Sequence, residues 1–150
     1  MNFEITGQTI GLLKSNVHKI NAVSGERIRE ELFKILSLRN TQDCFNIFDE
    51  VGLLCEIIHE LGKTRDVLQP KEHHWDVFHH SINSAVMAGK ILQNTSDLGF
   101  VRTNVPEFPE MDMYFKEKIS DGQTRLTFLK FTALLHDIGK PKTRLTLIHI

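Results

Sequence analysis

Residues 128–135 read FLKFTALL, and six of these eight residues are apolar. The apolar positions do not alternate as they would in a strand, and on a helix they leave no continuous polar face. A helix that lacks a polar face is buried on more than one side. We therefore predict a central helix over residues 123–138 that is wrapped by the rest of the chain.

A second helix of this kind is predicted over residues 75–93. At 100° per residue, Phe78 and Ile82 lie on one face, whereas Val77 and Met87 lie on the far side. The two helices without polar faces are expected to pack against each other. Because helical spacing of apolar residues recurs along the whole chain, the predicted fold class is all-α.

Four shorter helices are predicted ahead of this pair, over residues 9–20, 24–36, 41–51 and 54–61. Ser24 and Thr41 are suited to cap the second and third of them, and we expect the Ser24 side chain to accept a hydrogen bond from a backbone N–H near Arg27. Gly52 and Gly62 are suited to end the third and the fourth. Such short helices must pack antiparallel or crossed against their neighbours.

Two stretches interrupt the helical pattern. Residues 63–73 (KTRDVLQPKEH) form a polar link with one proline, and we place a domain boundary there, between residues 1–66 and 67–150. Residues 94–109 contain two prolines, a glycine and several polar turn formers, so they are expected to form a surface loop. A short helix is predicted after it, over residues 110–119.

The composition is that of an ordinary globular domain, with 150 residues, 41% of them hydrophobic, and a net charge of -1. This charge balance gives no global electrostatic case for nucleic-acid binding, although it leaves a local basic face open. Cys44 and Cys55 are expected to be reduced, buried thiols. We recognise no export signal and no membrane-spanning run, and expect a cytoplasmic protein.

His136 and Asp137 end the predicted central helix, just before Gly139. An imidazole and a carboxylate placed beside apolar residues lose water, and a divalent cation offsets that loss by binding both. The alternative is a helix end at which His136 caps carbonyl groups and Asp137 points to solvent. The residues by themselves leave both interpretations open.

The other predicted buried helix carries two adjacent histidines that point about 100° apart. His80 lies on the second apolar face and is the one expected to be buried, whereas His79 borders Asp76. Lys140 begins a basic run after the His-Asp pair, which would bind phosphate if a metal lay nearby and is otherwise a solvated tail. The chain has no glycine-rich phosphate loop, no Cys-x-x-Cys motif and no His-Glu-x-x-His motif.

Three segments resemble the bacterial tRNA nucleotidyltransferase and poly(A) polymerase family. Residues 21–36 (NAVSGERIREELFKIL) resemble a capped turn and helix in the neck of that family. Residues 73–82 (HHWDVFHHSI) and 129–143 (LKFTALLHDIGKPKT) resemble the HD domain that follows the neck in many members. The resemblance extends over residues 4–143 and implies a helical neck followed by a truncated HD-domain helical bundle.

The resemblance implies a metal site. It assigns His80, His136 and Asp137 as metal ligands and matches Lys140 with a catalytic lysine that approaches phosphate. The ion would be divalent, of the Mg, Mn, Ni or Zn class. An HD site normally closes with a further Asp on a later helix, which does not occur before Ile150, so we expect weak or absent metal occupancy and little phosphatase activity.

The resemblance also implies RNA as the partner, a tRNA or another RNA 3′ end. It assigns Ser24, Glu26 and Arg27 to a turn that braces the neck. The Gly-Gly, Asp-x-Asp and Glu-Asp-x-x-Arg motifs of the nucleotidyltransferase head have no counterpart, so nucleotide addition by this chain alone is not expected. The alternatives are a standalone metal-dependent phosphohydrolase of nucleotides or cyclic phosphates and an inert helical interaction module; homo-oligomerisation is left open.

Overall fold

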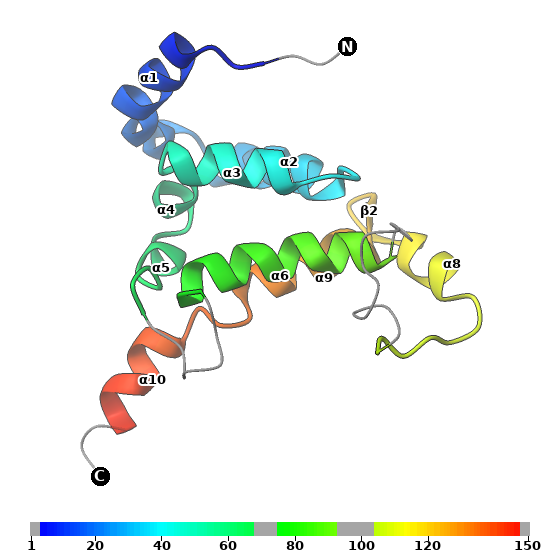
Figure 1. Ribbon diagram of the computed structural model, residues 1–150. Coiled ribbons are helices and arrows are strands. Elements are labelled where there is room, and N and C mark those ends of the chain that lie inside the picture. Colours follow the sequence, from blue (N-terminus) through cyan, green and yellow to red (C-terminus); the bar gives the residue numbers. More distant parts are fainter. Residues whose placement is uncertain (1–3, 68–74, 93–103, 148–150) are drawn as a thin grey trace.

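The computed structural model describes residues 4–67, 75–92 and 104–147, and most of these residues are helical (Figure 1). In the described ranges the strands are β1 (Lys118–Ser120) and β2 (Gln123–Thr124), which pair antiparallel as one small hairpin. The predicted all-α fold class is confirmed. None of the helices in these ranges is long and apolar enough to cross a membrane.

Two helices form the centre of the molecule, α6 (Val77–Leu92) and α9 (Arg125–Leu135). They make the most extensive helix contact of the described chain, as predicted from their missing polar faces. Every residue of α6 is buried or half-buried. The start of α9 is capped by Thr124, whose side-chain oxygen accepts a hydrogen bond from the Thr127 backbone N–H at 3.2 Å.

The prediction that the central helix is wrapped on every side is wrong. Leu129 is 36% exposed, and Thr132 one turn later is also exposed, so α9 keeps one face toward solvent. Its opposite face buries Thr127, Lys130 and Leu134. The prediction from the apolar positions failed because a charged residue, Lys130, points inward while an apolar one, Leu129, is exposed.

Six elements lie in residues 4–67, ahead of this pair: α1 (Gly7–Asn16), η1 (Val17–Ala22, a 3₁₀ helix), α2 (Gly25–Ser37), α3 (Gln42–Glu50), α4 (Leu53–Ile57) and α5 (His59–Gly62). In Figure 1, α2 and α3 lie above the central pair, and α4 and α5 connect the two levels along one side. Apolar residues from both levels form one core, which includes Leu36, Phe45, Leu54, Phe78 and Leu134. We call residues 4–67 the neck segment.

Two predicted helices of the neck segment differ in the structure. The helix predicted over residues 9–20 is α-helical only to Asn16 and continues as the 3₁₀ helix η1. The helix predicted over residues 54–61 is broken at Ile58, whose φ of -132° and ψ of 80° are not helical. Gly52 does end the third helix, and its φ of 77° lies in the left-handed region that glycine adopts without a Cβ clash.

The predicted cap of α2 is also corrected. Ser24 does precede the first residue of the helix, but its side chain accepts no capping hydrogen bond from the described residues. Instead, the Ser24 backbone oxygen accepts from the Ile28 N–H at 3.1 Å. At α3, the side chain that caps is that of Asn40, which accepts from the Gln42 N–H at 3.0 Å, rather than that of Thr41.

A buried lysine connects the neck segment to the central pair. Lys130 is 1% exposed, and its Nζ donates hydrogen bonds to the backbone oxygens of Leu36 at 3.1 Å and Leu38 at 2.8 Å. These carbonyl groups lie at the C-terminal end of α2, where helix carbonyls lack helical partners. Burial lowers the pKa of this ammonium group below its ordinary value.

A glycine on α6 makes room for this lysine. A Cβ atom at Gly89 would lie 2.5 Å from Lys130 Cε, closer than atoms can pack. The missing side chain therefore lets the aliphatic part of Lys130 pass between α6 and α2. Three helices meet at this lysine.

The C-terminal half differs from the prediction at two places. The helix predicted over residues 110–119 is shorter, α8 (Met111–Lys116), and is followed by the β hairpin. The basic run that begins at Lys140, for which phosphate binding and a solvated tail were both open, begins a further helix, α10 (Lys140–Leu147). Most of the predicted link at 63–73 and loop at 94–109 lies outside the described residues, and the domain division stays a prediction.

Candidate metal centre

The residues proposed as metal ligands come from the two central helices. His80 lies in the first turns of α6, where its backbone N–H donates a hydrogen bond to the backbone carbonyl oxygen of Asp76 at 2.9 Å. His136 is the C-cap of α9, and Asp137 follows it. Because α6 and α9 pack along each other, the start of α6 and the end of α9 lie at the same end of the pair.

The three side chains converge. Asp137 Oδ2 lies 3.7 Å from His80 Nε2 and 3.1 Å from His136 Nε2. One ligand atom from each residue lies within 4.8 Å of the others, so all three atoms can contact one ion. The Asp137 side chain is 13% exposed, which favours a partner for its charge.

The His136 ring is oriented by the backbone. Its Nδ1 lies 2.8 Å from the Ala133 carbonyl oxygen, which can only accept a hydrogen bond, so Nδ1 carries the proton. Nε2, which lies on the Asp137 side of the ring, is then the nitrogen that could bind a metal ion. A backbone carbonyl on the second nitrogen is a common support for a metal-binding histidine.

Lys140 contacts the same carboxylate oxygen. Its Nζ donates to Asp137 Oδ2 at 2.6 Å from the first residue of α10. A divalent ion at this centre would therefore compete with an ammonium group for one oxygen. Two imidazole nitrogens and a carboxylate oxygen fit a divalent ion of the Zn, Mn or Ni type, and the competition predicts low affinity.

The remaining predicted residues lie elsewhere. Ser24, Glu26 and Arg27 are exposed at the start of α2, and the structure does not bring them to the metal centre. Their role as a bracing turn stays a prediction. His79 and His80 are both half-buried, and His80 is the more buried of the two, as predicted, with 25% of its side chain exposed against 43%.

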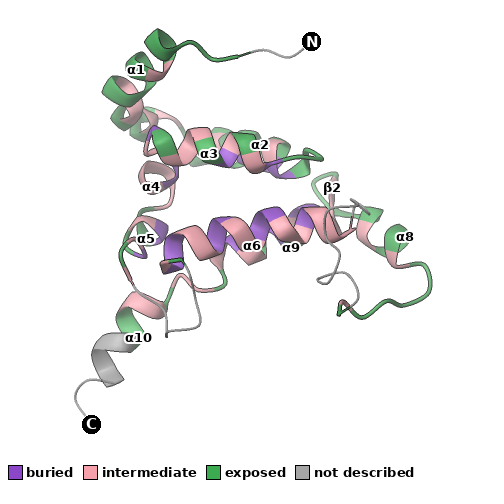
Figure 2. Cartoon of the chain, in the orientation of Figure 1, coloured by how far each residue is buried: buried purple, intermediate pink, exposed green. Residues whose placement is uncertain are grey.

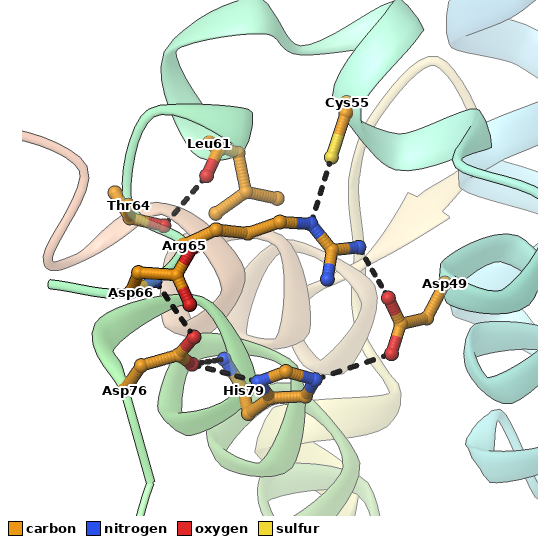
Figure 3. Close-up of polar contacts among 8 residues, drawn as sticks. All are labelled: Asp49, Cys55, Leu61, Thr64, Arg65, Asp66, Asp76 and His79. Carbon is orange, nitrogen blue, oxygen red and sulfur yellow. Dashed lines mark hydrogen bonds and ion pairs between the residues drawn. The ribbon is translucent and has the colours of Figure 1, made fainter.

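Sequence reasoning missed a polar cluster beside the centre, shown in Figure 3. Asp49 at the end of α3 forms an ion pair with Arg65, and its second oxygen lies 3.2 Å from His79 Nε2. Arg65 Nε also donates to Cys55 Sγ at 3.3 Å, and its guanidinium lies 3.8 Å above the Phe78 ring. Because these residues come from distant parts of the chain, no local spacing in the sequence indicated the cluster.

Asp76 completes the cluster and supports the start of α6. Its carboxylate accepts from the backbone N–H groups of His79 at 2.8 Å and Asp66 at 3.0 Å, and Nδ1 of His79 lies 2.7 Å away. Partial burial acts to raise the pKa of Asp76, but these hydrogen bonds outweigh it and hold the pKa below its ordinary value. The spacing Asp-x-x-His at a predicted helix start was a usable capping signal.

Comparisons with known proteins agree with the sequence motifs. Residues 2–63 match the family described as the probable RNA and SrmB-binding site of polymerase A. A multifunctional CCA protein of Neisseria meningitidis serogroup C (strain 053442) is 27% identical over 143 residues, which cover 94% of this chain and 27% of the relative. A protein of the same name from Neisseria gonorrhoeae (strain NCCP11945) is also 27% identical and is covered over 28% of its length.

The chain thus spans little more than a quarter of the length of these relatives. The similarity extends through the neck segment and through the central pair. The resemblance to the tRNA nucleotidyltransferase and poly(A) polymerase family is confirmed, and the HD-domain assignment of residues 73–82 and 129–143 stays a prediction.

Proposed function

From this relationship to CCA-adding and poly(A) polymerase proteins, we propose that the neck segment binds RNA, a tRNA or another RNA 3′ end, and that the central pair holds a divalent ion. The observation that carries the proposal is the similarity to CCA proteins over 94% of the chain, beyond the residues 2–63 that match the RNA-binding family. The proposal thus assigns RNA binding to the neck segment and metal binding to the central pair.

The neck segment offers cations for phosphate contacts. Lys19, Arg27 and Arg39 are exposed, and the described residues give none of them an ion pair. Lys14 and Lys34, by contrast, pair with Glu50 and Glu31. Cations that form no ion pair with the described residues can bind phosphate without first losing a partner, and their contribution falls as salt rises.

Nucleotide addition by this chain alone is not part of the proposal. The 150 residues contain no Gly-Gly pair, no Asp-x-Asp and no Glu-Asp-x-x-Arg motif, the patterns that a nucleotidyltransferase head would bring. The chain is expected to retain RNA without extending it. Incubation with a CCA-lacking tRNA, ATP, CTP and Mg²⁺ should therefore yield no lengthened product.

Fluorescence anisotropy with a labelled tRNA acceptor hairpin ending in CCA tests RNA binding. The Lys19→Ala/Arg27→Ala double variant should bind the hairpin more weakly. Its affinity should also fall less steeply with salt. The slope of the logarithm of the binding constant against the logarithm of the salt concentration should decrease in magnitude by about 0.7–0.9 for each phosphate that the variant no longer neutralises. The matched control is Lys14→Ala/Lys34→Ala, which removes two paired lysines. Absence of RNA binding by the unmodified chain would overturn the proposal.

At the metal centre, His80, His136 and Asp137 would hold the ion, and Ala133 would orient the His136 ring through its carbonyl group. A bound divalent ion would polarise a phosphate oxygen and lower the pKa of a coordinated water. Lys140 places a positive charge beside the carboxylate, where it can contact a phosphate group. Three ligands leave positions open for water, and the shared Asp137 oxygen weakens binding.

This position of Lys140 favours a second candidate function, hydrolysis of a nucleotide or cyclic phosphate. Elemental analysis after dialysis against Mn²⁺, Ni²⁺ or Zn²⁺ should show metal in the unmodified chain that is lost in His80→Ala and His136→Ala, but not in the exposed control His59→Ala. Hydrolysis of a 2′,3′-cyclic nucleotide should be slow and should disappear in His136→Ala. Full metal content in both ligand variants would place the site elsewhere.

A further inference from the structure

A cleft of about 720 Å³ lies between α2, the β hairpin and α9. It lies toward the start of α9, whereas His136 caps the end of that helix, so it is separate from the metal centre. Its volume falls in the range of small-molecule sites, roughly 300–1,000 Å³. The described neck segment contributes one wall through α2, which connects the cleft to the RNA-binding region.

The floor of the cleft is aromatic. Phe33 of α2 is buried, and its ring centroid lies 5.3 Å from that of Phe128 and 5.1 Å from that of Phe131, both on α9. Phe128 and Phe131 are half-buried, so they expose ring surface to the cleft. Aromatic rings of this kind stack with planar ligands.

The rim of the cleft is polar and carries both signs of charge. Arg29 of α2 faces Asp121 of the hairpin turn, with 3.6 Å between Nη1 and Oδ2. Asp121 and Gly122 have φ angles of 48° and 74°, and this left-handed turn directs the hairpin tip toward α2. Glu30 and Gln123 complete the rim with a second carboxylate and an amide.

This rim selects against simple ions. Two carboxylates, Glu30 and Asp121, would repel a phosphate inside the cleft, and Asp121 already has a cationic partner in Arg29. A neutral planar group with hydrogen-bond donors and acceptors along its edge fits the charges better. Its faces would contact the phenylalanines, and its edge would exchange hydrogen bonds with guanidinium, carboxylate and amide groups.

We propose that this cleft binds an unpaired nucleobase of the RNA that the neck segment holds. The proposal rests on the proposed function and adds to it a base-recognition site. The Arg29–Asp121 ion pair is exposed, with 59% and 70% of the two side chains accessible, so it costs little to open. A base can therefore enter between them and exchange that pair for hydrogen bonds to its own edge.

The test compares two single-stranded oligoribonucleotides of about twelve positions, one with bases and one abasic, by anisotropy with the full chain. Both carry the same phosphates, so a difference in affinity measures base contacts. We expect the abasic strand to bind the unmodified chain about tenfold or more weakly, the range of one stacked base. A tryptophan-containing peptide is added as a competitor of the intact strand. It tests whether the cleft binds an aromatic protein side chain instead of a base.

Two substitutions in the cleft, Ser120→Trp and Phe128→Leu, and one control, Ile119→Trp, test whether the base contacts lie in the cleft. Ser120→Trp places a bulky ring at the cleft rim, whereas Ile119, one residue earlier on β1, does not line the cleft, so Ile119→Trp is the matched control. Ser120→Trp should bind the intact strand as weakly as the abasic one, and Ile119→Trp should bind both as the unmodified chain does. Phe128→Leu, which keeps an apolar side chain and loses the ring, should lower the affinity for the intact strand only.

The outcomes distinguish a failure of RNA binding from a failure of the cleft proposal alone. If the unmodified chain binds neither strand, the RNA-binding function fails and the cleft proposal fails with it. If it binds RNA and Ser120→Trp and Phe128→Leu retain the preference for the intact strand, the cleft proposal alone is overturned. If the peptide displaces the intact strand, and Ser120→Trp binds that strand as tightly as the unmodified chain does, the cleft proposal is likewise overturned.

Discussion

The central pair and the neck segment are stabilised in different ways. In α6, seven residues are buried and none is exposed, and the pair packs along its whole length. In the neck segment, α1 buries no residue, and α4 and α5 are five and four residues long. Figure 2 shows this contrast as a buried centre and an exposed periphery.

Polar groups join the two regions. Lys130 donates to the end of α2, and Asp49 and Arg65 of the neck segment meet His79 of α6. The rigid pair can therefore hold metal ligands in fixed positions, while the neck segment keeps its cations at the surface. Substitutions in the two regions should accordingly have very different effects on stability.

The largest effect is expected in the central pair. Phe78 is fully buried beneath Arg65, and Phe78→Ala should lower the free energy of unfolding by about 3–5 kcal/mol. Leu12 on α1 is 60% exposed, and Leu12→Ala should change the same quantity by less than about 0.5 kcal/mol. Urea unfolding followed by circular dichroism measures both, and equal losses would show that the neck segment packs as tightly as the pair.

The connection between the regions should have the next largest effect. Lys130→Met keeps most of the side-chain volume but leaves the Leu36 and Leu38 carbonyl oxygens without their donor, so we expect a loss of about 2 kcal/mol. Lys34→Met is the matched control, because Lys34 is exposed and its ion pair with Glu31 is exposed as well. A Lys130→Met chain as stable as the unmodified protein would show that the buried ammonium contributes no net stability.

These contacts mark the limit of sequence-based prediction. The central pair was predictable because two helices without polar faces must cover each other, and the candidate metal ligands were assigned from the family motifs around His80 and His136. The contact from Lys130 to Leu36 joins residues 94 positions apart and has no periodic signal. A lysine in an apolar helix is ordinarily assigned to the surface, so the burial of Lys130 against the end of α2 was not expected from the sequence.

Short elements were the second limit. The hairpin strands have three and two residues, too few to show alternation, so no strand was predicted from the sequence. The break at Ile58 follows from packing of α4 and α5, because Ile58 itself is compatible with a helix. The cleft beside the hairpin was therefore not predictable from the sequence.

A pH-dependent effect is expected where Asp76 supports α6. Its folded pKa lies below the ordinary 3.8, so the carboxylate contributes stability that is present above pH 3.8 and lost as the pH falls through the folded value. Asp76→Asn should lower stability by about 1 kcal/mol at pH 7 and by less at about pH 3, since the carboxyl group of the unfolded chain is then mostly protonated. A stability difference that does not change between these two pH values would contradict this account.

The smallest effect compares two helix caps. Ser24 makes no side-chain capping bond, so Ser24→Ala should change the free energy of unfolding by less than about 0.5 kcal/mol. Thr124 accepts from the Thr127 N–H at the start of α9, and Thr124→Ala should cost about 1 kcal/mol. Thermal melting of both variants resolves the difference, and a larger loss for Ser24→Ala would restore the cap expected from the sequence.

The central claim is that the neck segment holds RNA while the central pair holds the ion. It is tested most directly by the affinity of the full chain for a CCA-ended acceptor hairpin, measured by anisotropy in the presence of EDTA. We predict that Lys19→Ala/Arg27→Ala weakens binding several-fold and that His80→Ala/His136→Ala leaves it unchanged. Unaltered affinity in the neck variant together with lost binding in the histidine variant would contradict the claim.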